Sequence, residues 1–161
     1  MNNKQKTLAN ITATSRQAAL YLQSRSEAMT GTELYAEEEY IPEFAAIVKA
    51  GNMLDRPIGF VCKTGAGRVV KLIQPYDSAV YPNEPEELPA QWGFKWSTDP
   101  AKALPFVAIA TSPYMTGDCC TENGKVWRSK QDNNVYAPSE YPTWWEEVAA
   151  KAYGLEIIYE G

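Results

Sequence analysis

Three carboxylates, Asp118, Glu122 and Asp132, lie close together in the sequence around one short hairpin. Glycoside hydrolysis needs only two such groups, one as general acid and one as nucleophile or base. The chain has no histidine, which excludes Ser-His and Cys-His hydrolase sites. Because 20 of the 161 residues are acidic and most should simply be solvated, we expect a non-enzymatic protein and keep a carboxylate glycosidase as the weakest alternative.

The three cysteines, Cys62, Cys119 and Cys120, are odd in number and two of them are adjacent. That arrangement fits neither a disulfide framework nor the spaced pairs of a zinc site. We interpret them as small buried apolar residues and expect no metal and no cofactor. The run TGAGR at 64–68 lacks the Lys-Ser/Thr end of a phosphate loop and is interpreted as a hairpin turn.

The net charge of −5 gives the chain no field for neutralising phosphates, so nucleic acid is not an expected partner. No apolar run approaches the roughly 18 residues that span a bilayer, and the amino-terminal segment lacks the apolar core of a secretion signal. We therefore expect no membrane partner and synthesis in the cytoplasm.

Residues 1–52 form the expected helical region. The segment 4–29 contains no proline or glycine, and apolar or small residues recur at alternating spacings of three and four. This seam, with interruptions at Ser15 and Arg25, predicts either an amphipathic helix lying on the rest of the chain or a bundle with other copies. Gly31 is expected to cap the helix. The candidate oligomerisation residues are Leu8, Ile11, Ala18 and Leu22.

The remainder of the chain contains an internal repeat. Residues 59–92 and 117–145 share the order glycine, strand, turn ending in glycine, strand, Tyr, Pro and Pro-x-x-Trp. The first copy has four extra residues, assigned to the loops around Tyr81. Two small β modules are expected, at 53–98 and 104–149, which makes the predicted fold class α+β.

Asn123-Gly124 is a strong two-residue hairpin signal and predicts that 118–122 pairs with 125–130. Alternation along the second strand places Trp127 inward, as it does Val70 in the first copy. Trp92 and Trp145 are expected to fold over their hairpins as core residues. Residues 150–161, with Leu155, Ile157 and Tyr159 alternating, predict a terminal strand whose open edge a partner chain could pair.

The second copy resembles a known family. Tyr114, Gly117-Asp118, the run 123–127 and Pro142-x-x-Trp145 followed by Glu-Glu-Val are similar to the small chitin-binding-type carbohydrate-binding modules found beside bacterial chitinases. The form NNVYAPSEYPTWWEEV is more similar to the copies in tailed-phage and prophage structural proteins. The resemblance covers roughly 57–97 and 112–149.

The resemblance implies a bacteriophage virion protein of the tail, fibre or baseplate region, made in the host cytoplasm. Its expected partners are copies of itself, with a trimer favoured, other virion proteins and a glycan of the bacterial cell wall or surface. The alternative is a free-standing, monomeric carbohydrate-binding module.

The family's exposed aromatic pair falls where this chain reads Gln-Asp-Asn-Asn at 131–134, so that sugar-stacking platform is missing. Replacement rings are expected among Trp144, Tyr136 and its first-copy counterpart Tyr81. The polar candidates that could bind sugar hydroxyls are Asp132, Asn133 and Asn134. The competing interpretation buries Trp144 against the helical region or a neighbouring subunit.

Overall fold

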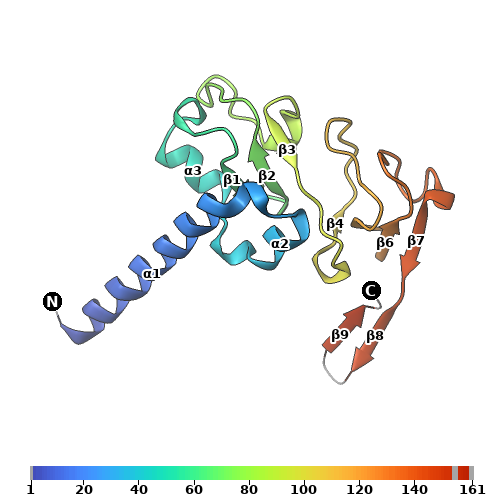
Figure 1. Cartoon of the computed structure of the whole chain (residues 1–161), viewed down its shortest axis with the longest axis horizontal. Coiled ribbons are helices and arrows are strands. Elements are labelled where there is room, and N and C mark those ends of the chain that lie inside the picture. The colour runs from blue at the N-terminus through green and yellow to red at the C-terminus, as the bar shows by residue number, and fades with distance from the viewer. Residues whose placement is uncertain (1, 154–155, 160–161) are drawn as a thin grey trace.

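The computed structural model describes the backbone of residues 2–153 and 156–159, and the side chains of residues 2–10 and 13–149. The chain is α+β. A long helix is followed by short helices and by two small sheets that lie side by side (Figure 1).

The helical region begins with α1 (Asn3–Arg25), whose amino-terminal part projects from the body (Figure 1). Asn2 caps it through a capping box with Gln5. Shorter helices follow at η1 (Ser26–Ala28), α2 (Gly31–Ala36), η2 (Glu38–Tyr40), α3 (Phe44–Ala50) and η3 (Met53–Asp55). The predicted helix over 4–29 is confirmed as far as Arg25. The prediction that Gly31 caps α1 is wrong. Gly31 is the first residue of α2, whose own capping box joins Thr30 and Glu33.

The carboxyl end of α1 belongs to the core of its own chain. Leu22 is 0% exposed and lies in one cluster with side chains of α2 and the first sheet. It therefore cannot contact a partner helix in this conformation, which corrects its assignment to the oligomerisation seam. Ala18 is half-buried, Leu8 is exposed, and the side chain of Ile11 lies outside the described residues.

The first sheet has the order β1 (Val61–Lys63), β2 (Val69–Leu72), β3 (Trp92–Phe94), all antiparallel. The second has the order β4 (Leu104–Pro105), β5 (Cys119–Glu122), β6 (Lys125–Ser129), β7 (Trp145–Val148), with β4 parallel to β5. Single helical turns lie at η4 (Pro85–Glu87), η5 (Pro100–Lys102) and η6 (Pro142–Trp144). β8 (Ala150–Tyr153) and β9 (Glu156–Tyr159) form a separate hairpin.

The predicted repeat is present in the backbone hydrogen bonds. Gly59 N donates to Leu72 O at 2.7 Å in the first copy, and Gly117 N donates to Ser129 O at 2.8 Å in the second. Both glycines have positive φ, 90° and 97°, which a side chain would strain. The two copies therefore begin with the same turn and the same pairing.

The copies differ in the loop that follows the hairpin. This connection spans 20 positions from Leu72 to its strand partner Trp92, but only 16 from Ser129 to its partner Trp145. The extra residues lie in the segment that carries Tyr81, as predicted. Because a longer loop costs little additional free energy, the first copy can contain this insertion and keep the same strand pairing.

The predicted hairpin of the second copy is confirmed. Asn123 and Gly124 have φ of 53° and 74°, and the strands on either side pair antiparallel. Trp127 is half-buried against the main core. Val126, which alternates with Trp127 and so lies on the opposite face, is also buried, against Cys119 and Val148; both faces of β6 are therefore covered.

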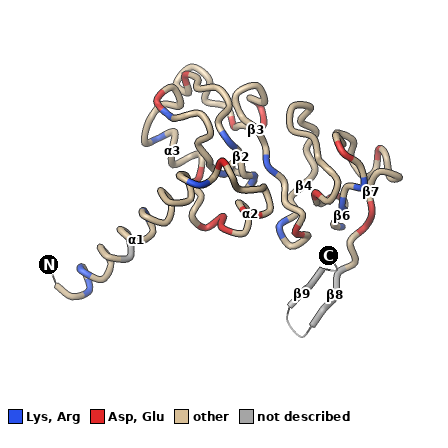
Figure 2. The backbone as a smooth tube through the Cα atoms, viewed as in Figure 1, with Lys and Arg blue, Asp and Glu red and all other residues tan. Residues whose placement is uncertain are grey.

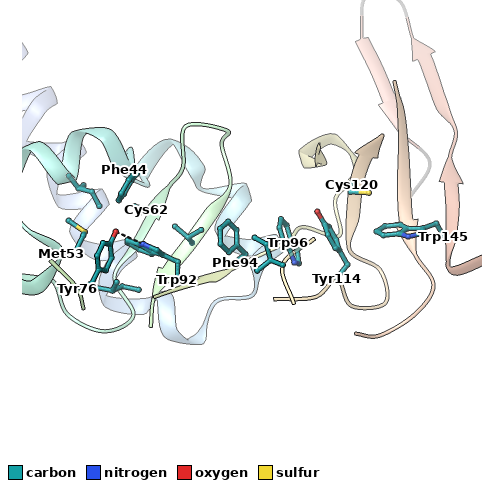
Figure 3. Packing of buried hydrophobic residues seen from close by; sticks show 14 residues of the cluster. Phe44, Met53, Cys62, Tyr76, Trp92, Phe94, Trp96, Tyr114, Cys120 and Trp145 are labelled. Carbon is teal, nitrogen blue, oxygen red and sulfur yellow. Dashed lines mark hydrogen bonds between the residues drawn. The ribbon is translucent and has the colours of Figure 1, made fainter. Parts of the chain in front are cut away.

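A continuous row of aromatic rings joins the two sheets (Figure 3). Trp96 stacks on Tyr114 with ring centroids 4.3 Å apart and an interplanar angle of 12°. Phe94 stacks on Trp96 from the other side at 5.9 Å, and Trp145 meets Tyr114 edge-on at 5.5 Å. The two modules consequently share one core instead of having two.

The tryptophans that close the two copies are buried, as predicted. Trp92 is packed edge-on against Phe44 and Tyr76, and its Nε1 donates to the Tyr76 hydroxyl at 3.0 Å. Burial raises the pKa of the Tyr76 hydroxyl. Trp92 and Trp145 are each the first residue of a strand, β3 and β7, that pairs with the hairpin of its copy. Each copy is therefore a sheet, of three strands in the first and four in the second, and not a hairpin with an irregular cover.

The predicted terminal strand is confirmed for residues 156–159, which pair with β8. Leu155 lies outside the described residues, and pairing of this strand by another chain stays a prediction.

Candidate functional site

The turn η6 brings two aromatic residues to one side of the chain. Pro142 occupies the first helical position, where its fixed φ favours the turn. Trp144 N donates to Tyr141 O at 3.1 Å, closing a turn of three residues. Since side chains three apart eclipse in a 3₁₀ turn, Tyr141 and Trp144 lie together, with ring centroids 4.8 Å apart.

Tyr136 is held in place by hydrogen bonds to its backbone. Its N–H donates to Asn134 Oδ1 at 3.1 Å, and its carbonyl accepts from Trp145 Nε1 at 2.8 Å. Both partners are buried. The main chain on either side of this tyrosine is therefore fixed by the core, while its ring remains outside.

Tyr136, Tyr141 and Trp144 form one aromatic cluster at the surface. The Tyr136 ring lies 5.6 Å from each of the other two rings, tilted by 31° to Tyr141 and by 76° to Trp144. The two tyrosines are each 44% exposed, whereas Trp144 is half-buried and also packs against the main core. The cluster thus presents apolar ring surface and two phenolic hydroxyls to solvent from a rigid base.

Asn134 is not available to a ligand, which corrects its assignment as a binding residue. It is 0% exposed, pairs through its backbone with Tyr114, and its Nδ2 donates to Ser129 Oγ at 3.0 Å. Its role is to fix the backbone of Tyr136 by accepting the hydrogen bond from Tyr136 N.

Asp132 and Asn133 are exposed, as a ligand-binding role would require. Asp132 Oδ1 accepts from Thr116 N at 2.9 Å, and this hydrogen bond lowers the pKa of the Asp132 carboxyl. Asn133 adopts a positive φ of 55° and its backbone N–H approaches Met115 Sδ at 3.4 Å. Both residues therefore bond to the loop at 115–116, and in the part of the chain that the structure describes no hydrogen bond or ring contact joins either of them to the aromatic cluster.

The first copy does not repeat the cluster. Tyr81 is exposed, but the turn equivalent to η6 carries Leu88 and Gln91, joined by the hydrogen bond from Gln91 N to Leu88 O at 3.0 Å. The same backbone turn therefore presents no aromatic pair. The structure brings Tyr136 and Trp144 together and leaves Tyr81 in a different loop.

Tyr141 is the surface residue that the sequence reasoning missed. The signal was present in the spacing, because Tyr-Pro-x-Trp places an aromatic residue immediately before a proline-initiated turn and another at its end.

The carboxylates near the second hairpin accept hydrogen bonds from the backbone of neighbouring loops. Asp118 Oδ2 accepts from Met115 N at 2.8 Å, while Glu122 Oε1 accepts from Ser139 N at 2.9 Å. Burial raises the pKa of the Asp118 carboxyl, and the negative charge of Asp132 contributes. Each of these carboxylates therefore has a backbone hydrogen bond that accounts for its position.

The cysteines are free thiols in the core, as interpreted from the sequence. Burial raises the pKa of all three, that of Cys119 to about 11, so the thiolate form is suppressed. Within the described residues no group of His, Cys, Asp or Glu side chains is arranged to hold a metal ion. None of the helices in the described part of the chain has the length and apolarity to cross a membrane.

An exposed group of tyrosine and tryptophan rings on a rigid base is suited to bind a ligand with an apolar face and surrounding hydroxyls. Sugar rings have both, and they stack on aromatic faces while accepting hydrogen bonds from phenols. Comparison of the chain with family models, with curated protein sequences and with solved structures returned no match in any of the three.

Proposed function

We propose that the chain is a non-enzymatic structural protein of a bacteriophage or prophage virion whose second module contacts a bacterial surface glycan. The observation that carries the glycan contact is the cluster of Tyr136, Tyr141 and Trp144, in which both tyrosines are substantially exposed although their backbone is fixed. The virion assignment rests on the resemblance of the second copy to modules of tailed-phage proteins.

The rigidity of the cluster supports a binding role. An aromatic side chain loses few rotamers on binding, and a backbone that is already fixed loses less still. Tyr136 is fixed by Asn134 and Trp145, and Tyr141 precedes a proline-initiated turn. The rings are held in place before a sugar arrives.

The glycosidase alternative receives less support from the same residues. Asp118, Glu122 and Asp132 each accept a hydrogen bond from a backbone N–H, which is sufficient to explain their positions. The free-standing binding module differs from our proposal in assembly and not in its sugar contact, so solution mass distinguishes the two.

The test is a sedimentation assay with purified peptidoglycan, and with chitin as a second polymer, using the full chain. Tyr141→Ala removes an exposed ring and leaves the core in place, so we expect at least a tenfold loss of affinity. Tyr21→Ala is the matched control, because Tyr21 is an exposed tyrosine on α1, away from the cluster. Binding by the unmodified chain to neither polymer, or equal losses for Tyr141→Ala and Tyr21→Ala, would overturn the glycan contact.

A further inference from the structure

The positive charge of α1 contrasts with the rest of the chain. Residues 1–25 contain Lys4, Lys6, Arg16 and Arg25 and no Asp or Glu, while the rest of the chain has 11 basic and 20 acidic residues. The side chains of residues 2–10 and 13–17 are exposed. A basic helical arm thus projects from an acidic body (Figure 2).

Acidic side chains surround the opposite end of the same helix. Glu37 is paired with Arg25 at 2.7 Å, and the exposed residues Glu27, Glu33 and Glu39 lie on the short helices that pack around it. Glu27, Glu33 and Glu39 form no ion pair with any of the described residues. The helix therefore has a basic tip and an acidic base.

A hollow of about 300 Å³ lies against α1 near this base. It is lined by Ser15, Ala19, Glu39, Tyr40, Ile41 and Pro42. Small side chains on the helix allow close approach of another helix, and Tyr40 supplies an exposed apolar wall. Glu39 gives the hollow a negative charge.

Lys4 lies on the same face of α1 as the hollow. It precedes Ser15 by 11 residues, close to three full turns, and so is about 16 Å along the helix from it. Lys6, two residues further on, points to the opposite face of the helix. Only one of these two lysines can therefore take part in a contact made along that face.

We propose that two copies of this chain associate through antiparallel α1 helices, with the tip of each helix seated in the hollow of the other and Lys4 facing the partner copy's acidic base. The arrangement is self-complementary, since the same contact forms twice about a two-fold axis. A parallel bundle, as in the expected trimer, would instead bring the Lys4 residues together, which like charges oppose. This inference concerns assembly and does not rest on the glycan contact.

The test is the solution mass of the full chain by light scattering over a concentration series. We expect twice the chain mass, with dissociation promoted by salt because the contact is exposed and ionic. Lys4→Glu should weaken association by at least tenfold, whereas Lys6→Glu, the matched control with the same change of charge on the other face, should leave it unchanged.

Charge exchange makes the test specific to the proposed pair. Glu39→Lys should weaken association as Lys4→Glu does, and the double variant Lys4→Glu/Glu39→Lys should restore it. A monomer or a trimer for the unmodified chain, equal effects of Lys4→Glu and Lys6→Glu, or failure of the double variant to recover would each overturn the antiparallel dimer.

Discussion

The side-chain amide of Gln23 pairs with the backbone of Val61 as a neighbouring strand would. Gln23 Nε2 donates to Val61 O at 2.7 Å, and Val61 N donates to Gln23 Oε1 at 2.9 Å. One residue of α1 thereby satisfies both backbone groups of a buried residue on the edge strand β1.

Replacing Gln23 with alanine should therefore destabilise the fold although the residue lies outside the hydrophobic clusters. The change leaves a buried donor and a buried acceptor without their partners, at a cost of about 2 kcal/mol. Urea denaturation measures this difference. Gln17→Ala, on an exposed position of the same helix, should change stability by less than about 0.5 kcal/mol; comparable losses would contradict the role assigned to Gln23.

Gly31 should not tolerate a side chain. A Cβ at this position would clash with the carbonyl oxygen of Trp96, so α2 and the end of the first copy would have to separate. Gly31→Ala should cost about 3 kcal/mol, the upper end for overpacking. Gly51→Ala is the control, because its added Cβ would approach nothing nearer than 3.9 Å. Equal thermal midpoints for the two variants would show that the close approach is not present in solution.

Substitutions of the neighbouring residues Asn133 and Asn134 should differ in their effects on the stability of the fold. Asn134→Ala removes two hydrogen bonds made by a buried side chain and should cost about 2 kcal/mol. It should also weaken glycan binding, because Tyr136 loses a backbone anchor. Asn133→Gly should be neutral or slightly stabilising, since glycine adopts the positive φ at this position without strain. Chemical denaturation followed by the peptidoglycan assay measures both effects, and a stable Asn134→Ala variant would contradict the structural role.

The ion pair of Arg25 and Glu37 should give stability a defined pH dependence. The hydrogen bond from Arg25 lowers the pKa of the Glu37 carboxyl below its ordinary value of 4.5. A lowered pKa in the folded state means that the contribution is present above pH 4.5 and is lost as the pH falls through the folded-state pKa. The unmodified chain should therefore melt higher than Glu37→Gln at pH 7.

This difference in melting temperature should shrink on acidification below pH 4.5. Glu27→Gln, which removes the same charge from an exposed position on η1, is the control for the change of charge alone. A difference for Glu37→Gln that persists unchanged at pH 3 would mean that the ionic contact does not stabilise the fold.

The sequence was most informative where the determinant is local. The Asn123-Gly124 turn follows from two adjacent residues, and the repeat with its longer first loop follows from the order of residue types in the two copies; the structure contains both. Turn chemistry depends on the φ preference of single residues, so it can be predicted without knowing the tertiary contacts.

Contacts between distant segments could not be predicted in the same way. Polarity suggested that Asn134 faces solvent, but its pairing with Tyr114 buries it. The heptad spacing of Leu22 is equally compatible with a partner helix and with the sheet of its own chain, and the structure has the second. Of the aromatic cluster, Trp144 and Tyr136 were predicted, while Tyr141 required the geometry of the 3₁₀ turn.

The stacking of Trp96 on Tyr114 determines what can be cut from this protein. Trp96 belongs to the end of the first copy and Tyr114 to the start of the second, at 4.3 Å. A fragment that began after residue 98 would expose the face of Tyr114 and thereby loosen the contact between Tyr114 and Trp145, whose indole anchors Tyr136. Although the second copy carries the candidate binding surface, it is not a transplantable unit, and any probe or fusion built on that surface requires the complete two-copy body.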